Sequence, residues 1–345
     1  MEILQNHYRL ARIEMPLPAE VPWPSVDAGA ARRLVGGCPV AGQTPLAQMP
    51  ALAKEIGVEQ LWVKDERSRM GLGSFKALGA AYVIACDHKA GQSQGRTYVT
   101  ASAGNHGMSV AAGAAAFGAN AVVYIAQTVP ESFALRLREL GAQVVREGEI
   151  YEDSMAAAAK AAQDNDWALL SDSSWAGYFE RPHRLMEGYL ILMAEAIEQM
   201  PTAPTHIFLQ AGVGGLAGAC AALARKAWGD SVTITVVEPA AAPALKASIE
   251  AGRAIATEGP VSDMGRLDCK EPSLIALKGL ARDADYFMLI NEDQGNAGAR
   301  ASAEHNMAAS PSGAAGIAGL MARMGELGLD ANSRVLCILS EGVAT

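Results

Sequence analysis

The sequence predicts an α/β fold with a doubly wound, mainly parallel sheet, and three observations predict it. Short apolar runs typical of strands alternate with Ala-rich helical segments, the rhythm of parallel strands joined by crossover helices. Half of the residues are hydrophobic but only 6% are aromatic, with Ala, Gly and Val dominant, which suits helices packed closely on a buried sheet. The length of 345 residues allows one large or two medium domains.

The alternation can be followed along the chain after an irregular arm of about 45 residues, whose prolines block regular helix. Because they are short and apolar, strands are predicted at 61–63, 97–100, 121–125, 143–145, 206–209, 232–237, 286–290 and 334–339. Helices are predicted at 75–85, 107–117, 131–140, 151–163 and 182–200. Residues 91–189 have an alternation of their own, so we expect a smaller mobile domain there, beside a large domain of residues 1–90 plus 190–345.

The charge pattern indicates an enzyme that acts on a small molecule. The formal net charge is −9, spread without long blocks of one sign, which argues against nucleic acid as a partner. No apolar run is long enough to span a membrane, and residues 1–24 lack the apolar core of a signal peptide. Five scattered cysteines without C-x-x-C spacing predict neither a disulfide framework nor a zinc cluster, so we expect a cytoplasmic protein without a metal site.

A lysine at the start of a predicted helix is the first candidate for chemistry. Lys76 ends the segment Gly71-Leu72-Gly73-Ser74-Phe75-Lys76, directly after a loop of small residues. A partly desolvated lysine amine loses its proton more easily and can form a Schiff base. Taken alone, the pattern also fits a solvated lysine in a first helical turn.

Two further loops follow predicted strands and precede predicted helices. In the loop 100–107, the backbone can approach a flat ligand and the amide of Asn105 can donate to a ring oxygen, although an ordinary βα turn with an Asn cap fits equally. In the loop 210–216, backbone N–H groups at a helix N-terminus would form a phosphate cup. Dinucleotide folds use similar loops, but the glycine spacing here does not match G-x-G-x-x-G.

Together, and in this order, the three stretches resemble the tryptophan-synthase-β family of pyridoxal 5′-phosphate (PLP) enzymes, also called fold type II. The resemblance implies two lobes, each with a mainly parallel twisted sheet flanked by helices, and a homodimer. It also implies that Lys76 holds PLP as a Schiff base and that Asn105 contacts the 3′-oxygen of the cofactor. The phosphate would be bound by Gly212, Val213, Gly214, Gly215 and Leu216.

Within that family, the chain is similar to the diaminopropionate ammonia-lyases over most of its length. The matching segments include 43–46, 62–66, 171–178, 208–214, 267–273 and 340–342. The resemblance implies that Asp172 is a catalytic base beside Lys76 and that Ser340 hydrogen bonds to the pyridine nitrogen. The substrate-binding residues would be Ser102, Ala103 and Gly104.

One departure from that pattern bears on the substrate. Those lyases accept both enantiomers and use one carboxylate base for each, but Ala103 replaces the aspartate that precedes G-N-H-G. We therefore expect β-elimination from a small amino acid, with L-2,3-diaminopropionate preferred and converted to pyruvate and ammonia. The alternative is a β-hydroxy amino acid dehydratase of the serine/threonine, 3-hydroxyaspartate or phenylserine type. A nicotinamide oxidoreductase and a non-catalytic PLP-binding protein are further alternatives.

Overall fold

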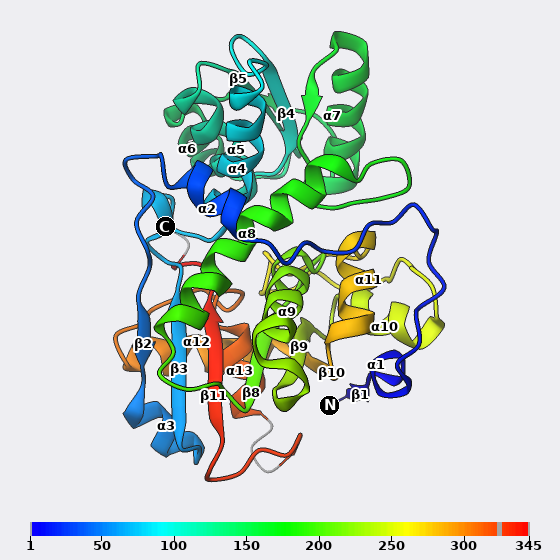
Figure 1. Cartoon of the computed structure of the whole chain (residues 1–345). Coiled ribbons are helices and arrows are strands. Elements are labelled where there is room, and N and C mark those ends of the chain that lie inside the picture. The colour runs from blue at the N-terminus through cyan, green and yellow to red at the C-terminus, as the bar shows by residue number, and fades with distance from the viewer. Residues whose placement is uncertain (1, 323–325, 344–345) are drawn as a thin grey trace.

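The strands form two separate sheets in a computed structural model that describes residues 2–322 and 326–343 (Figure 1). Within these residues the larger sheet has the order β1-β10-β9-β8-β11-β3-β2 and the smaller one β6-β5-β4-β7. The larger sheet comprises β1 (Ile3–Gln5), β2 (Leu46–Gln48), β3 (Gln60–Asp65), β8 (His206–Gln210), β9 (Thr233–Pro239), β10 (Tyr286–Ile290) and β11 (Arg334–Leu339). The smaller sheet comprises β4 (Thr97–Ala101), β5 (Asn120–Ile125), β6 (Gln143–Arg146) and β7 (Ala168–Leu169).

The predicted α/β class is confirmed. Every ladder of the smaller sheet is parallel, and the larger sheet is parallel except where β1 pairs with β10 and β2 with β3, at its two edges. The central strands are buried along nearly their whole length, as expected for strands covered by helices on both faces. Each predicted strand is present, whereas β1, β2 and β7 were not predicted because strands of two or three residues carry no clear periodic signal.

Helices cover both faces of each sheet (Figure 1). Helices α8, α9 and α11 lie on one side of the larger sheet and α13 on the other, while α5 and α7 cover the smaller sheet. Their bounds are α1 (His7–Ala11), α2 (Gly29–Val35), α3 (Pro50–Ile56), α4 (Lys76–Lys89), α5 (Asn105–Ala116), α6 (Glu131–Glu139), α7 (Tyr151–Asn165), α8 (Glu180–Gln199), α9 (Gly215–Trp228), α10 (Ala244–Ala251), α11 (Leu274–Asp283), α12 (Glu292–Glu304) and α13 (Ala315–Met321). Two short 3₁₀ turns, Arg69–Gly71 and Gly229–Ser231, complete the described elements.

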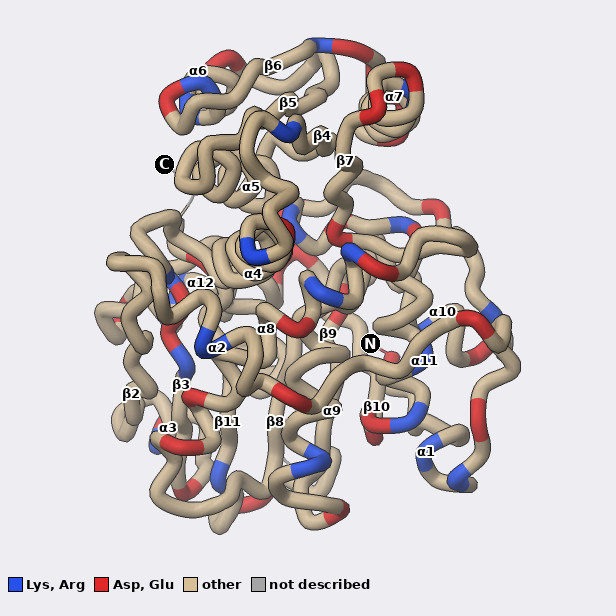
Figure 2. Tube along the Cα trace, turned by 45° about the horizontal axis from the view of Figure 1, so that its top comes forward, with Lys and Arg blue, Asp and Glu red and all other residues tan. Residues whose placement is uncertain are grey.

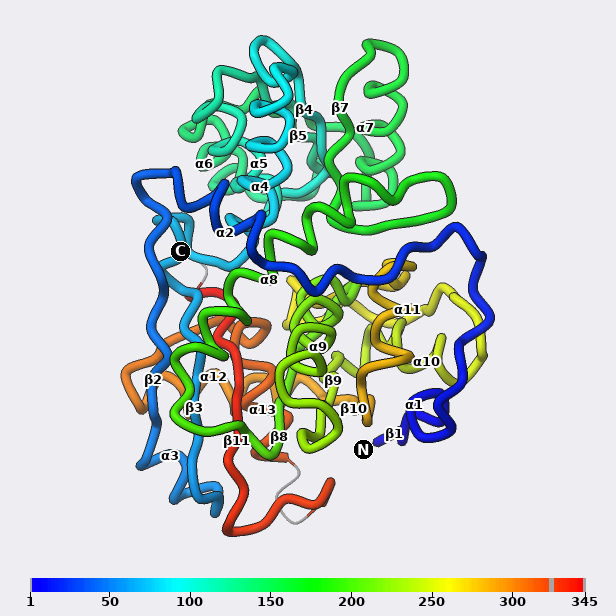
Figure 3. Tube along the Cα trace, viewed as in Figure 1, coloured from blue at the N-terminus to red at the C-terminus, as the bar shows by residue number. Residues whose placement is uncertain are grey.

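The N-terminal arm is more regular than the sequence indicates. It contains β1, α1 and α2, and it crosses the molecule from β10 to α4 (Figure 3). Asn6 organises its start: its Oδ1 accepts from the N–H groups of Tyr8 and Arg9, and its Nδ2 donates to carbonyls at the end of α11. These contacts are tertiary, so local sequence does not predict them; the stretch that holds the prolines is free of helix and strand, as expected.

Small residues bring the helices that carry site residues close together. A Cβ on Gly79 of α4 would lie 2.3 Å from Leu185 Cδ2 of α8. A Cβ on Gly188 of α8 would lie 2.5 Å from the carbonyl oxygen of Leu78. Because only glycine allows this approach, the start of α4, with Lys76, is held against the middle of α8.

A buried ion network holds the segment that leads to Lys76. Arg69 is 2% exposed and donates to both Glu66 and Glu195, with nitrogen–oxygen distances of 2.7 Å. Lys64, on β3, contacts Glu195 at 2.7 Å, and Thr44 donates to Glu66 at 2.6 Å. Buried charges are tolerated where each is paired and hydrogen bonded, and these are. The network therefore ties β3, the arm and α8 together around the loop before α4.

Charged residues are otherwise scattered along the chain, without a long block of one sign (Figure 2). Among the described helices, none has the length and apolarity needed to cross a membrane. No group of His, Cys, Asp and Glu in the described part of the chain has the arrangement of a metal site.

Candidate active site

Four loops that follow parallel strands supply the candidate residues. The loop after β8 leads into α9, the loop after β4 leads into α5, and Asp172 and Ser340 follow β7 and β11. Lys76 joins them from the first position of α4, whose preceding residue Phe75 donates its N–H to the Ser340 carbonyl. Ligands in open parallel sheets bind at the carboxyl ends of the strands, and here that end of both sheets faces the same region.

Lys76 and Asp172 form an ion pair between Nζ and Oδ2. Their side chains are only 20% and 19% exposed. The ammonium also lies 5.2 Å from the ring centre of Phe75 and 5.8 Å from that of Tyr189. Lys76 is thus held as a cation between one carboxylate and two aromatic rings, at the floor of the site.

The pair shifts the pKa values of both partners. Burial alone would raise the pKa of Asp172, but the charge of Lys76 outweighs it and holds this pKa well below its usual range. Burial likewise opposes the charged form of Lys76, yet the Asp172 carboxylate raises the lysine pKa above its usual value. His106 is 4% exposed, and burial lowers its pKa, so the imidazole that contacts the Leu170 carbonyl is neutral at pH 7. Asp172 is therefore the charged acceptor of the site.

The loop Gly212–Leu216 forms a cradle at the N-terminus of α9. Gly214 caps the helix with φ +98° and no side-chain hydrogen bond, so the first N–H groups of α9 lack a side-chain cap. A Cβ on Gly212 would lie 2.8 Å from Cys269 Sγ, and one on Gly215 3.5 Å from the Tyr189 ring. The bare helix end favours an anion, and the absent side chains leave room for it.

Two buried hydroxyls near Lys76 have no hydrogen-bond partner within the described residues: those of Tyr189 and Ser74. Tyr189 is 1% exposed, and its ring packs edge-on against Phe75 with ring centres 4.8 Å apart. A buried hydroxyl without a partner costs about 1–3 kcal/mol, so such a group in a native fold needs an explanation. A bound ligand with donors and acceptors would supply that explanation.

Ser340 and Asn105 have protein partners in this structure. The Ser340 hydroxyl accepts from Gln210 Nε2 at 3.1 Å and is 4% exposed. The Asn105 amide donates to Glu341, whose carboxyl also accepts from the Ser310 hydroxyl. Both residues lie near the start of α4, which carries Lys76. The Ser340 carbonyl accepts from the Phe75 N–H, and Glu341, the partner of Asn105, forms a β-bridge with Ser74.

The loop Ser102–Gly104 begins α5. The Ser102 hydroxyl accepts from the Gly104 N–H at 3.3 Å, and Gly104 caps α5 without a side-chain hydrogen bond. Ala103 is partly buried and packs on the main hydrophobic core, so no carboxylate stands at this position. The guanidinium of Arg266 lies over the loop, because a Cβ on Gly104 would be 2.4 Å from its Nη1.

Sequence reasoning missed Tyr189, Arg266 and the contact of Glu341 with Asn105. Tyr189 has the pattern of a core residue in a long helix, and an orphaned hydroxyl cannot be read from periodicity. The family resemblance could have pointed to both residues, because Arg266 directly precedes the matching segment 267–273 and Glu341 lies inside the matching segment 340–342.

Residues 38–341 match the family model described as "Pyridoxal-phosphate dependent enzyme". The chain belongs to this family. It is 30% identical over 334 residues to the diaminopropionate ammonia-lyase of Escherichia coli strain K12, covering 87% of this chain and 84% of that protein. The Salmonella typhimurium protein of the same name is 31% identical over 342 residues, covering 87% and 85%.

Solved structures agree with this family assignment. The diaminopropionate ammonia-lyase of Escherichia coli, in complex with an aminoacrylate-PLP azomethine reaction intermediate, superposes with a TM-score of 0.89 at 28% identity. The match covers 99% of this chain and 94% of that one. Threonine deaminase isoform 2 from Solanum lycopersicum, at 20% identity and a TM-score of 0.81, shares the fold. The predicted fold type and the predicted cofactor, PLP, are thereby confirmed.

The residues of the site fit PLP. The bare N-terminus of α9 and its glycine cradle suit a phosphate, and Lys76 is the amine next to it. The Tyr189 ring lies 5.8 Å from the Lys76 ammonium, and its hydroxyl has no hydrogen-bond partner among the described residues, so it could bond to the cofactor or substrate. A neutral hydroxyl such as that of Ser340 suits a pyridine nitrogen that carries no proton.

Proposed function

We propose that this PLP-dependent enzyme is an ammonia-lyase that eliminates the β-amino group of 2,3-diaminopropionate, preferring the L-enantiomer, and releases pyruvate and ammonia. The observation that carries the proposal is the Lys76–Asp172 ion pair beside the glycine cradle of α9. The names of the Escherichia coli and Salmonella relatives support the substrate.

Different residues of the site have different roles in this reaction. When bound, PLP accepts the electron pair that remains at the substrate α-carbon after its proton leaves. Lys76 would hold the cofactor, Gly212–Leu216 would bind its phosphate, Asn105 its 3′-oxygen, and Ser340 its ring nitrogen. Asp172 takes a proton from Lys76 or from the substrate, which its depressed pKa allows only as a transient step. Ser102 and the N–H groups beside it hold the substrate carboxylate.

The stereochemical preference follows from Ala103. A methyl group cannot accept a proton, so the loop Ser102–Gly104 offers no base to the face of the α-carbon that it covers. Asp172 and Lys76 together supply proton transfer on the opposite face. L-substrates should therefore react, and D-substrates should react poorly.

A second candidate function is supported by the same loop. Without a carboxylate at position 103, the loop resembles that of serine and threonine dehydratases, and a hydroxyl can replace the amine as the leaving group. A β-hydroxy amino acid would then give a 2-oxo acid and one ammonia. The elimination and the role of Lys76 are the same in both functions.

The test is oxo-acid and ammonia release from the PLP-loaded protein, with Lys76→Ala as the blank. The panel holds L- and D-2,3-diaminopropionate, L-serine, L-threonine and both diastereomers of 3-hydroxyaspartate and phenylserine. Two ammonia per pyruvate from L-diaminopropionate supports the lyase. Turnover of hydroxy amino acids alone assigns the protein to the dehydratases, and no turnover of any substrate refutes both.

The proposal also covers the domain organisation, the oligomeric state and the cellular location of the protein. The smaller sheet lies within residues 91–189, which supports a smaller mobile domain there beside residues 1–90 plus 190–345. Family resemblance supports a homodimer, and five free cysteines without disulfide spacing support the reducing environment of the cytoplasm. Light scattering of the purified protein and fractionation of cells test these two points.

A further inference from the structure

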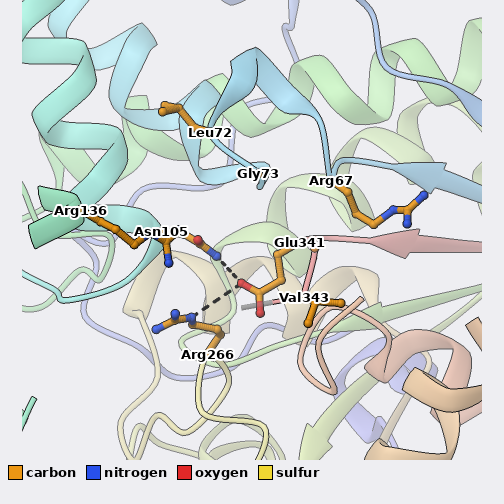
Figure 4. Close-up of a pocket in the computed structure, with 9 residues that line it drawn as sticks. Arg67, Leu72, Gly73, Asn105, Arg136, Arg266, Glu341 and Val343 are labelled. Carbon is orange, nitrogen blue, oxygen red and sulfur yellow. Dashed lines mark hydrogen bonds and ion pairs between the residues drawn. The ribbon is translucent and has the colours of Figure 1, made fainter. Parts of the chain in front are cut away.

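A small pocket of about 160 Å³ lies beside the candidate site, with Asn105 and Glu341 in its wall (Figure 4). Its lining is rich in positive charge: Arg67, Arg136 and Arg266 against the single acid Glu341. The chain as a whole carries a net charge of −9, so a pocket with this balance stands out. Such a lining favours an anionic ligand.

The Arg266 guanidinium lies over the Phe133 ring, 5.6 Å from its centre, and beside Glu341. Its Nε lies 3.8 Å from a Glu341 oxygen, and among the described residues this guanidinium donates no hydrogen bond. Arg67 differs, because it makes a bidentate pair with Asp65 at 2.8 and 2.7 Å and bonds the Ala308 carbonyl. In Figure 4 the head of Arg67 points away from Glu341, whereas Arg266 points toward Asn105 and Glu341.

Glu341 does not depend on Arg266 for its hydrogen bonds. Its carboxyl accepts from the Asn105 amide and the Ser310 hydroxyl. Arg266 can therefore turn to a ligand carboxylate without leaving the buried Glu341 carboxyl without donors. Bidentate pairing with a carboxylate would use N–H groups that now have no protein acceptor.

The position of Arg266 decides which carboxylate it can meet. In the proposed function, the α-carboxylate of the substrate is bound by Ser102 and by the N–H groups at the uncapped start of α5. The Arg266 guanidinium lies against Gly104 of the same loop, on the side that opens into the pocket. A second carboxylate, attached to the β-carbon of the substrate, is the group that this position suits.

We propose that Arg266 is a specificity residue that binds a carboxylate on the β-carbon, so that the enzyme accepts, besides 2,3-diaminopropionate, acidic β-amino or β-hydroxy amino acids of the 2,3-diaminosuccinate or 3-hydroxyaspartate type. This inference rests on the proposed function, whose reaction it leaves unchanged. A proton leaves the α-carbon, and ammonia or water leaves the β-carbon. Hydrolysis of the resulting enamine by one water then gives oxaloacetate and one further ammonia.

The test compares substrates that differ only by methyl and carboxylate on the β-carbon. The pairs are L-threonine with L-threo-3-hydroxyaspartate, and threo-2,3-diaminobutanoate with threo-2,3-diaminosuccinate. In the wild type, kcat/KM should favour the carboxylate member of a pair by about tenfold or more, the effect of one charge-assisted contact. Arg266→Met should bring the ratio to within about twofold of unity, and Arg266→Lys should keep part of it. The exposed Arg253→Met is the matched control and should keep the wild-type ratio.

Two results would overturn the inference: a wild-type ratio near unity, or an equal loss for both members of a pair in Arg266→Met. The second result would mean that Arg266 binds the α-carboxylate or stabilises the fold. Thermal unfolding of the variant distinguishes these two roles, because only the loss of a stabilising role lowers the melting temperature. If no substrate turns over, the proposed function fails, and calorimetric titration of the PLP-loaded protein still decides the role of Arg266. Succinate should then bind at least about tenfold more tightly than butyrate, and Arg266→Met should abolish the difference.

Discussion

The ammonium of Lys76 and the carboxylate of Asp172 are in contact although 96 positions separate them along the chain. Lys76 begins α4, and Asp172 follows β7 of the smaller sheet, so the ion pair joins two segments that are far apart in the sequence. A lone lysine in a first helical turn would be solvated. The fold instead gives this lysine a buried counter-ion, which makes it part of a site.

Asp172→Asn should reduce kcat on the L-substrate about 10²- to 10⁴-fold, because the amide cannot accept a proton in the transition state. PLP binding should persist, since the cradle and Lys76 remain. Asp164→Asn is the control, because Asp164 forms an exposed pair with Lys160 and should leave kcat unchanged. A kcat within threefold of wild type in Asp172→Asn would remove Asp172 from the mechanism.

Tyr189→Phe should weaken PLP binding about five- to twentyfold without destabilising the cofactor-free protein. By hydrogen-bond geometry the hydroxyl has no partner among the described residues, and the polar group that interacts with it is the Lys76 ammonium, so its removal should cost the cofactor-free fold little. Fluorescence titration with PLP and urea unfolding of the cofactor-free protein measure the two effects. Tyr98→Phe is the matched control: its buried hydroxyl donates to Asp87 at 2.9 Å, so it should destabilise the fold and leave PLP affinity unchanged. The opposite pattern would show that the Tyr189 hydroxyl is only structural.

Arg69→Met should lower the free energy of unfolding by about 3–5 kcal/mol, since it leaves Glu66 and Glu195 buried and short of a cation. Arg32→Met is the comparison. Arg32 pairs with the exposed Glu198, and its loss should cost about 0–1 kcal/mol. Urea unfolding of both variants measures the difference. Equal losses would contradict the role of the buried network.

The contribution of Glu238 to the stability of the protein should fall as pH rises from about 5 to 8. Burial raises the pKa of this carboxyl to about 8, although it accepts from the N–H groups of Leu245 and Lys246. The folded state therefore binds a proton that the unfolded state has lost above its usual pKa of 4.5, and this preference disappears as pH passes 8. Relative to wild type, the urea midpoint of Glu238→Gln should rise as pH goes from 5 to 9, because the variant lacks this loss. Parallel profiles for wild type and variant would exclude Glu238 as the cause.

The sequence predicted the parts of the fold and site that depend on local pattern. Strands β8 to β11 were found because they are short apolar runs, and the loops that follow β8 and β11 carry predicted site residues. The N-terminal strand β1 was missed because it exists only through its pairing with β10. Tyr189 and Arg266 were missed for a related reason: what makes them notable is a missing partner, which depends on residues brought close by the tertiary fold.

The most direct test of the account is to locate the attachment of the cofactor. The PLP-loaded protein is treated with borohydride, which fixes the cofactor to its amine, and digested for mass spectrometry. The account predicts the added mass on the peptide that contains Lys76 and none in Lys76→Ala. Label on another lysine, such as the buried Lys64, or no label at all, would contradict it.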